Sequence, residues 1–208
     1  TRKDALAFYK RFYAPNNATL VIAGDVDAQK IRPEIEKTFG QVPPQPAIPP
    51  VRIRPQEPLP VASRTVTLAD PRVEQPMLRR YYLVPAATTA ATGESPALDV
   101  LARLMGEGSN AYLYRALVVD KPLAVNTNAS YQGTMVDPTQ FTIAVAPKPG
   151  VSFAAVEQAI DGVIAHLAAN PVPAEDLERV KTQLIAQAVY AQDSQTTLAR
   201  WYGAGMTV

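Results

Sequence analysis

The 208-residue sequence has no cysteine and a single histidine, His166. These two counts exclude disulfide frameworks, cysteine nucleophiles, thiolate zinc sites and sites with several histidine ligands. A catalytic zinc ion normally takes three protein ligands, which are drawn mostly from His and Cys. We therefore expect no metal ligand, no bound cofactor and no catalytic residue within this chain.

Neither an excess of one charge nor a long apolar run is present. The 20 basic and 19 acidic residues give a formal net charge of +1, which argues against a nucleic-acid partner. No apolar stretch approaches the ~20 residues of a transmembrane helix, so we expect no membrane span. Hydrophobic residues make up 47% of the chain, which is enough for a folded core. The lack of cysteine fits a bacterial envelope or a cytoplasm, and of the two we expect the bacterial periplasm.

The first stretch, residues 1–41, is typical of a helix–strand–helix unit. Apolar residues recur at helical spacing after Thr1, which is a suitable N-cap, and Asp27 can cap a second helix. A short apolar run rich in β-branched residues lies between the two helices. The predicted elements are a helix over 3–13, a strand over 18–24 and a helix over 28–39. Residue 1 is Thr and no signal region follows, so we expect both ends to be cuts within a longer protein.

Residues 42–60 hold 8 of the 20 prolines. Such a segment can neither pair in a central strand nor continue a helix. It is typical of an extended, polyproline-like linker. The alternative is a proline motif that a partner protein recognises.

Residues 61–208 show a longer alternation of strand and helix patterns. Ser95 followed by Pro96 is a helix start, and Pro173 with an acidic first turn opens a last long helix. The order of these strand and helix patterns predicts an α+β fold, with helices packed on one face of an antiparallel or mixed sheet. The predicted strands cover 64–68, 77–84, 123–131 and 139–146, and the predicted helices begin near 95, 110, 153 and 174.

Three sets of residues could suggest chemistry. His166 lies off the apolar stripe of its helix, with no metal ligand three or four residues away, which favours a surface histidine over a base or ligand. Residues 106–110, GEGSN, resemble a phosphate loop but follow a helix and lack its lysine, so a turn between helices is favoured over a backbone donor site for a peptide or anion. Asp25 and Asp27 are explained by a turn and a helix cap, because a cation site needs further oxygen ligands.

Residues 8–27, FYKRFYAPNNATLVIAGDVD, resemble a segment of the pitrilysin/insulinase family of zinc metallopeptidases, which includes the mitochondrial processing peptidases. Similarity to the later family pattern continues through the helix after Ser95, through Gly108-Ser109, through Leu123-Ala124, and around Glu175-Asp176. It covers nearly the whole chain and implies the metallopeptidase LuxS/processing-peptidase-like α+β fold.

The resemblance also implies an order of domains. It makes residues 1–41 the C-terminal part of a first domain, 42–60 the interdomain linker, and 61–208 a truncated second domain without zinc. The zinc motif H-x-x-E-H, in which two histidines bind zinc and the glutamate is the general base, would lie before residue 1. The full-length protein would then be a zinc metalloendopeptidase, and this half would help to enclose a peptide substrate.

One departure from the family pattern concerns two peptide-binding positions. Peptidase members carry an Arg and, seven residues later, a Tyr that hold the substrate backbone and the developing oxyanion. Alignment on Leu123-Ala124 places Val118 at the Arg position and Val125 at the Tyr position. Arg115 does not substitute, because Pro122 stands seven residues after it. The resemblance then implies a bacterial heterodimer in which a paralogous partner subunit supplies the Arg/Tyr pair.

Two other functions fit the same sequence. One is a non-catalytic structural or scaffold homologue of the family. An intact upstream zinc motif would favour the peptidase, and its loss would favour this homologue. The other is a peptide-binding module without a partner subunit. If the chain belongs to a peptidase subunit, its peptide substrate is expected to add a strand to an exposed sheet edge.

Overall fold

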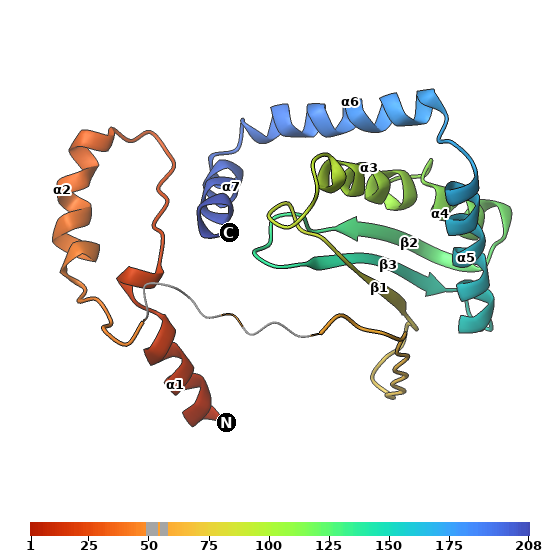
Figure 1. The fold of residues 1–208 in the computed structure, drawn as a ribbon, viewed down its shortest axis with the longest axis horizontal. Coiled ribbons are helices and arrows are strands. Elements are labelled where there is room, and N and C mark those ends of the chain that lie inside the picture. The colour runs from red at the N-terminus through yellow and green to blue at the C-terminus, as the bar shows by residue number, and fades with distance from the viewer. Residues whose placement is uncertain (49–53, 55–57) are drawn as a thin grey trace. The chain divides into compact units, whose positions relative to one another are not determined.

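The computed structural model of the chain describes residues 1–48, 54 and 58–208 (Figure 1). These residues form two compact units. The first unit contains Thr1–Leu68 and Ser194–Thr207, and the second contains Ala69–Asp193 and Val208. Part of the predicted linker over 42–60 lies outside the described residues. The domain boundaries predicted from the sequence stay a prediction.

The helices of the first unit begin where the sequence predicts. Thr1 caps α1 (Arg2–Phe12) in a capping box with Asp4, which satisfies backbone N–H groups that the first turn leaves free. Asp27 caps α2 (Ala28–Thr38) by accepting hydrogen bonds from the backbone N–H groups of Gln29 and Lys30. The unit also contains η1 (Pro15–Asn17), η2 (Phe39–Gln41) and a helix that was not predicted separately, α7 (Gln195–Thr207).

Two predicted strands are absent from the described structure. Residues 18–24 and 64–68 pair with no other strand. The backbone of Ala18 is extended, as predicted, but the side chains of Val66 and Leu68 are 91% and 84% exposed. Their β-branched pattern favours extended backbone, but a strand also needs a neighbour that accepts its hydrogen bonds. None of the described residues of the first unit is buried. The described residues of this unit therefore form no buried core of their own.

The start of the proline-rich segment is held by hydrogen bonds of Gln45. Asn16 Nδ2 donates to the carbonyl of Gln45 at 3.0 Å, and Gln45 N donates to Asn16 Oδ1 at 2.9 Å. The Gln45 side chain also donates to the carbonyl of Lys10 in the last turn of α1. The amide of Asn16 thus pairs with both backbone groups of Gln45, as a neighbouring strand would.

The second unit is built on a three-stranded antiparallel sheet in the order β1-β3-β2. The strands are β1 (Leu78–Val84), β2 (Ala124–Tyr131) and β3 (Thr139–Pro147). The helices are α3 (Glu94–Gly106), the single turn α4 (Tyr112–Tyr114), α5 (Phe153–Ala169) and α6 (Ala174–Ala191), and a π-helical segment, η3 (Arg115–Asp120), follows α4. The predicted α+β class is confirmed.

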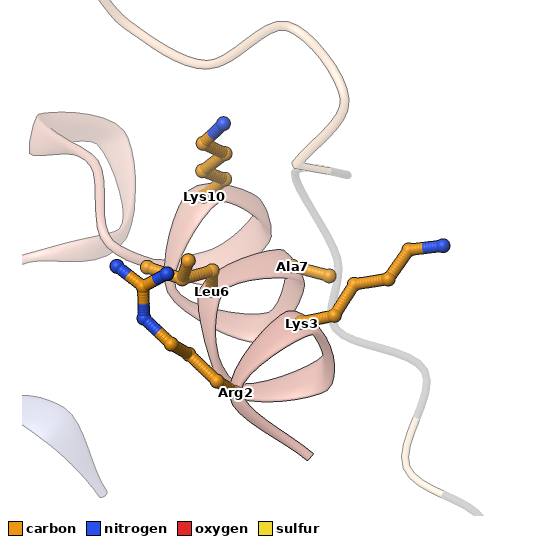
Figure 2. Close-up of a pocket in the computed structure, with 5 residues that line it drawn as sticks. All are labelled: Arg2, Lys3, Leu6, Ala7 and Lys10. Carbon is orange, nitrogen blue, oxygen red and sulfur yellow. The ribbon is translucent and has the colours of Figure 1, made fainter.

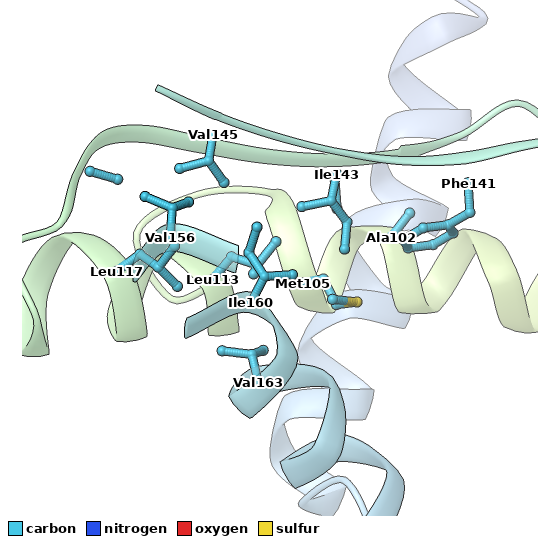
Figure 3. Close-up of a cluster of buried hydrophobic side chains, with 12 residues drawn as sticks. Ala102, Met105, Leu113, Leu117, Phe141, Ile143, Val145, Val156, Ile160 and Val163 are labelled. Carbon is cyan, nitrogen blue, oxygen red and sulfur yellow. The ribbon is translucent and has the colours of Figure 1, made fainter. Parts of the chain in front are cut away.

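The core lies between one face of the sheet and the helices. Phe141, Ile143 and Val145 alternate along β3 with less buried residues, and Val145 points toward Val156 of α5 whereas Phe141 lies beside Ala102 of α3 (Figure 3). This period of two is what a strand with one covered face requires. Helices α3 and α5 both contact the sheet, and α6 packs on α3. The helices therefore cover one face of the sheet.

The end of α3 approaches β2 at a position where only glycine fits. A Cβ atom on Gly106 would lie 1.8 Å from the backbone N of Ala129 and 2.6 Å from its Cα. Gly106 is buried and its φ is not positive. Glycine is therefore required at this position because there is no space for a Cβ atom, and not because of its backbone conformation.

The predicted N-cap of α3 is wrong by two residues. The helix begins at Glu94, after Gly93 in the left-handed region (φ 85°). Ser95 is buried and hydrogen-bonds with the hydroxyl of Tyr131 at 3.1 Å, while that hydroxyl donates to the carbonyl of Pro85 at 2.7 Å. Ser95 thus joins the start of α3 to the end of β2.

Candidate functional site

The residues that could suggest metal chemistry do not come together. Within the ranges that the structure describes, no group of three or more His, Cys, Asp or Glu residues could hold a metal ion. His166 is exposed on α5, and its Nδ1 lies 3.2 Å from Nδ2 of Asn170. Asp27 is a helix cap. In the same described part of the chain, no helix is long and apolar enough to span a membrane.

The loop that resembles a phosphate loop is a turn between helices. Gly108 adopts the left-handed conformation (φ 81°), and the N–H of Ala111 donates to its carbonyl at 3.2 Å. Ser109 does not cap the next helix, because the N-cap of α4 is Ala111 and makes no side-chain bond. The predicted turn between helices is confirmed by this geometry.

A hollow beside α1 is lined by Arg2, Lys3, Leu6, Ala7 and Lys10 (Figure 2). All five residues come from this one helix. Their three cationic side chains point in different directions and do not converge on a common point. Without convergent groups from a second element, the hollow has no arrangement that would orient a ligand.

Val118 and Val125, the positions that match the family Arg and Tyr, lie at two irregular points of the backbone. Val118 lies in the π-helical segment, where the N–H of Lys121 donates to the carbonyl of Ala116 five residues back, and it packs against the core. Val125 lies at a register shift of β2 and is 54% exposed. Such irregularities are frequent near functional sites. Neither valine can donate a hydrogen bond to an oxyanion, and their role in peptide binding stays a prediction.

The uncovered face of the sheet is the other candidate surface. Strand register places its outward residues in rows across the three strands, with Ala144 and Thr142 of β3 in the middle. The outward residues carry no carboxylate in any of the three strands. The rows are Arg79–Ala144–Asn128, Tyr81–Thr142–Ser130 and Leu83–Gln140.

Two consecutive arginines of β1 have opposite environments. Arg80 faces α5, where it donates to Asp161 Oδ1 at 2.5 Å and lies 3.9 Å from a Glu157 carboxylate oxygen. Its side chain is 21% exposed. Arg79 is exposed on the other face, and it has no ion-pair partner within the described part of the chain. Alternation along the strand thus places Arg80 against α5 and leaves Arg79 exposed, where a ligand could reach it.

We expect Arg80→Ala to lower the free energy of unfolding by about 1–2 kcal/mol, because it removes an ion pair and the packing of a half-buried alkyl stem. The guanidinium of Arg80 holds the pKa of Asp161 below its ordinary value. The pair therefore stabilises the fold above the ordinary pKa of aspartate, and this stabilisation is lost as the pH falls through the lowered value. Urea unfolding at neutral and acidic pH measures both effects. Arg79→Ala is the control, and an equal loss in both variants would contradict the assignment.

Sequence comparisons relate the chain to a family of peptidases. The family model described as the peptidase M16 inactive domain matches residues 1–184. The curated zinc protease PqqE of Helicobacter pylori is 27% identical over 201 residues, which are 96% of this chain and 44% of that protein. The chain thus spans less than half the length of this relative.

Solved structures show the same fold. The structure of a protease from Helicobacter pylori matches 100% of this chain and 49% of its own chain, with 24% identity and a TM-score of 0.88. The M16 inactive domain from Pseudomonas fluorescens matches 64% of this chain and 31% of its own, with 17% identity and a TM-score of 0.54. Because the family model covers most of the sequence, this chain belongs to the M16 peptidase family and contains its inactive domain.

Proposed function

We propose that this chain is the zinc-free part of a zinc metalloendopeptidase subunit, and that it helps to enclose and hold the peptide substrate. The observation that carries the proposal is the sheet of the second unit. Helices cover one of its faces, while the other presents mainly uncharged polar side chains. Among the residues that the structure describes, β1 and β2 each pair on one side only, so an extended peptide could lie across the open face or add to either edge as a further strand.

The hydrolytic chemistry must come from outside these residues. Zinc, when bound in such peptidases, polarises the scissile carbonyl and activates water. No described group of this chain could hold the ion, and the only histidine is an exposed one. We therefore assign zinc and its H-x-x-E-H ligands to another part of the full-length protein. The present residues would bind and orient the peptide.

We also propose that a paralogous partner subunit supplies the Arg/Tyr pair. Support comes from the two valines, because neither can donate a hydrogen bond and Val118 packs against the core. A heterodimer in which one subunit carries zinc and the other carries the pair would complete the site. The alternative is a scaffold subunit that has neither half of the site, and the valines fit it equally.

The test is a peptidase assay of the full-length protein, alone and mixed with its paralogue, together with metal analysis. We expect one zinc ion per full-length protein, little activity alone, and chelator-sensitive activity in the mixture. Full activity alone would contradict the shared site, and absence of zinc would favour the scaffold. The 208-residue chain should retain no zinc and cleave no peptide.

A further inference from the structure

The open sheet face of the second unit has a charge pattern that specifies a class of peptide. Arg79 is its cation, and β1, β2 and β3 contain no aspartate or glutamate at any position. Arg80, the other charged residue of these strands, is on the covered face and paired with α5. Among the described strand residues, a ligand on the open face therefore meets one positive charge without an ion-pair partner, surrounded by neutral side chains.

The row that contains Arg79 has a small residue, Ala144, at its centre. Ala144 stands between Arg79 and Asn128, each of which pairs with it across the sheet. Strands lie about 4.8 Å apart, so the two longer side chains start about 10 Å from each other with a methyl group between them. In the next row, Thr142 separates Tyr81 from Ser130 and fills the corresponding space with a larger side chain.

Both longer side chains of this row can donate hydrogen bonds. A guanidinium has five N–H donors in a fork that matches a carboxylate, and the amide of asparagine adds two more donors. A carboxylate placed over Ala144 would meet donors from both sides, whereas an ammonium group would meet the repulsion of Arg79.

We propose that Arg79, Ala144 and Asn128 form a notch that takes an aspartate or glutamate side chain of an extended peptide. The peptidase would then favour neutral to acidic peptides over basic ones. This proposal rests on the proposed function, since it assumes that the open face contacts the substrate, and it adds a residue, Arg79, that determines specificity.

The experiment measures binding of fluorescein-labelled extended peptides to the 208-residue chain by anisotropy at low salt. The peptides are identical except for a central Glu, Gln or Lys. We expect the Glu peptide to bind roughly threefold tighter than the Gln peptide, the size of one exposed ion pair, and the Lys peptide to bind weakest. Added salt should reduce the difference.

Two variants assign the effect to the notch. Arg79→Gln should bind the Glu and Gln peptides equally, and Arg79→Glu should favour the Lys peptide. Arg72→Gln is the control, because it removes the same charge from an exposed side chain that pairs with Asp70 outside the sheet. An equal effect of Arg72→Gln, or tightest binding of the Lys peptide, would overturn the notch alone. Absence of binding by all three peptides would overturn the proposed contact with substrate as well.

Discussion

Replacing Gly106 with alanine is expected to unfold the second unit or to lower its free energy of unfolding by about 3 kcal/mol or more. The added Cβ would lie 1.8 Å from the backbone N of Ala129. A backbone atom in a central contact cannot rotate away, so α3 would have to separate from β2. Alanine favours helix over glycine by about 1 kcal/mol, which is too little to offset this clash. Thermal and urea unfolding, followed by circular dichroism, measure the loss.

Gly162 of α5 provides the matched control. It also lies inside a helix, but a Cβ there would meet nothing within 4 Å. Gly162→Ala should therefore keep the gain in helix propensity and stabilise the chain by up to about 1 kcal/mol. A loss of stability for Gly106→Ala and a gain for Gly162→Ala would separate the effect of steric space from that of helix propensity. If Gly106→Ala were as stable as the natural sequence, the close contact between α3 and β2 would be wrong.

Introducing arginine at Val118 is expected to cost about 3 kcal/mol, whereas the same change at Val125 should cost less than about 0.5 kcal/mol. Val118 packs against the core within the π-helical segment, so an arginine there would bring a charge toward Leu117 and its neighbours. Val125 is 54% exposed, and a charged side chain there can remain in water. Urea unfolding of the two variants gives the comparison.

The same pair of variants bears on the shared active site. If Val118→Arg is strongly destabilising, this chain cannot regain the family Arg by a single substitution, because the position is occupied by core packing. Tolerance of arginine at Val118 would show that the side chain can turn outward and would weaken that conclusion. Val125→Tyr should be tolerated in either case.

Sequence patterns predicted the fold class and most helix starts, because these depend on neighbouring residues. Thr1, Asp27 and Ser152 each accept a hydrogen bond from a backbone N–H at the start of a helix. The π-helical segment and the break before α7 leave no comparable periodic signal. The strands predicted over 18–24 and 64–68 failed because pairing depends on a partner that local sequence does not specify.

The candidate site was less accessible to sequence reasoning. The positions of Val118 and Val125 follow from similarity to a family motif, but their different exposure follows only from the fold. Strand alternation separates Arg79 from Arg80 without indicating which of them faces the helices. The register with β3 and the contact with Asp161 decide this. The open face could therefore be identified only after the sheet and its covering helices were known.

The absence of buried residues from the described part of the first unit has a consequence for measurements on this chain. Amide hydrogens of the first unit should exchange with solvent within the dead time of mixing. Those of β3 should be retained until the second unit unfolds globally. Heat absorbed on melting would then come almost wholly from residues 69–193. A single calorimetric transition would thus report the stability of that part alone.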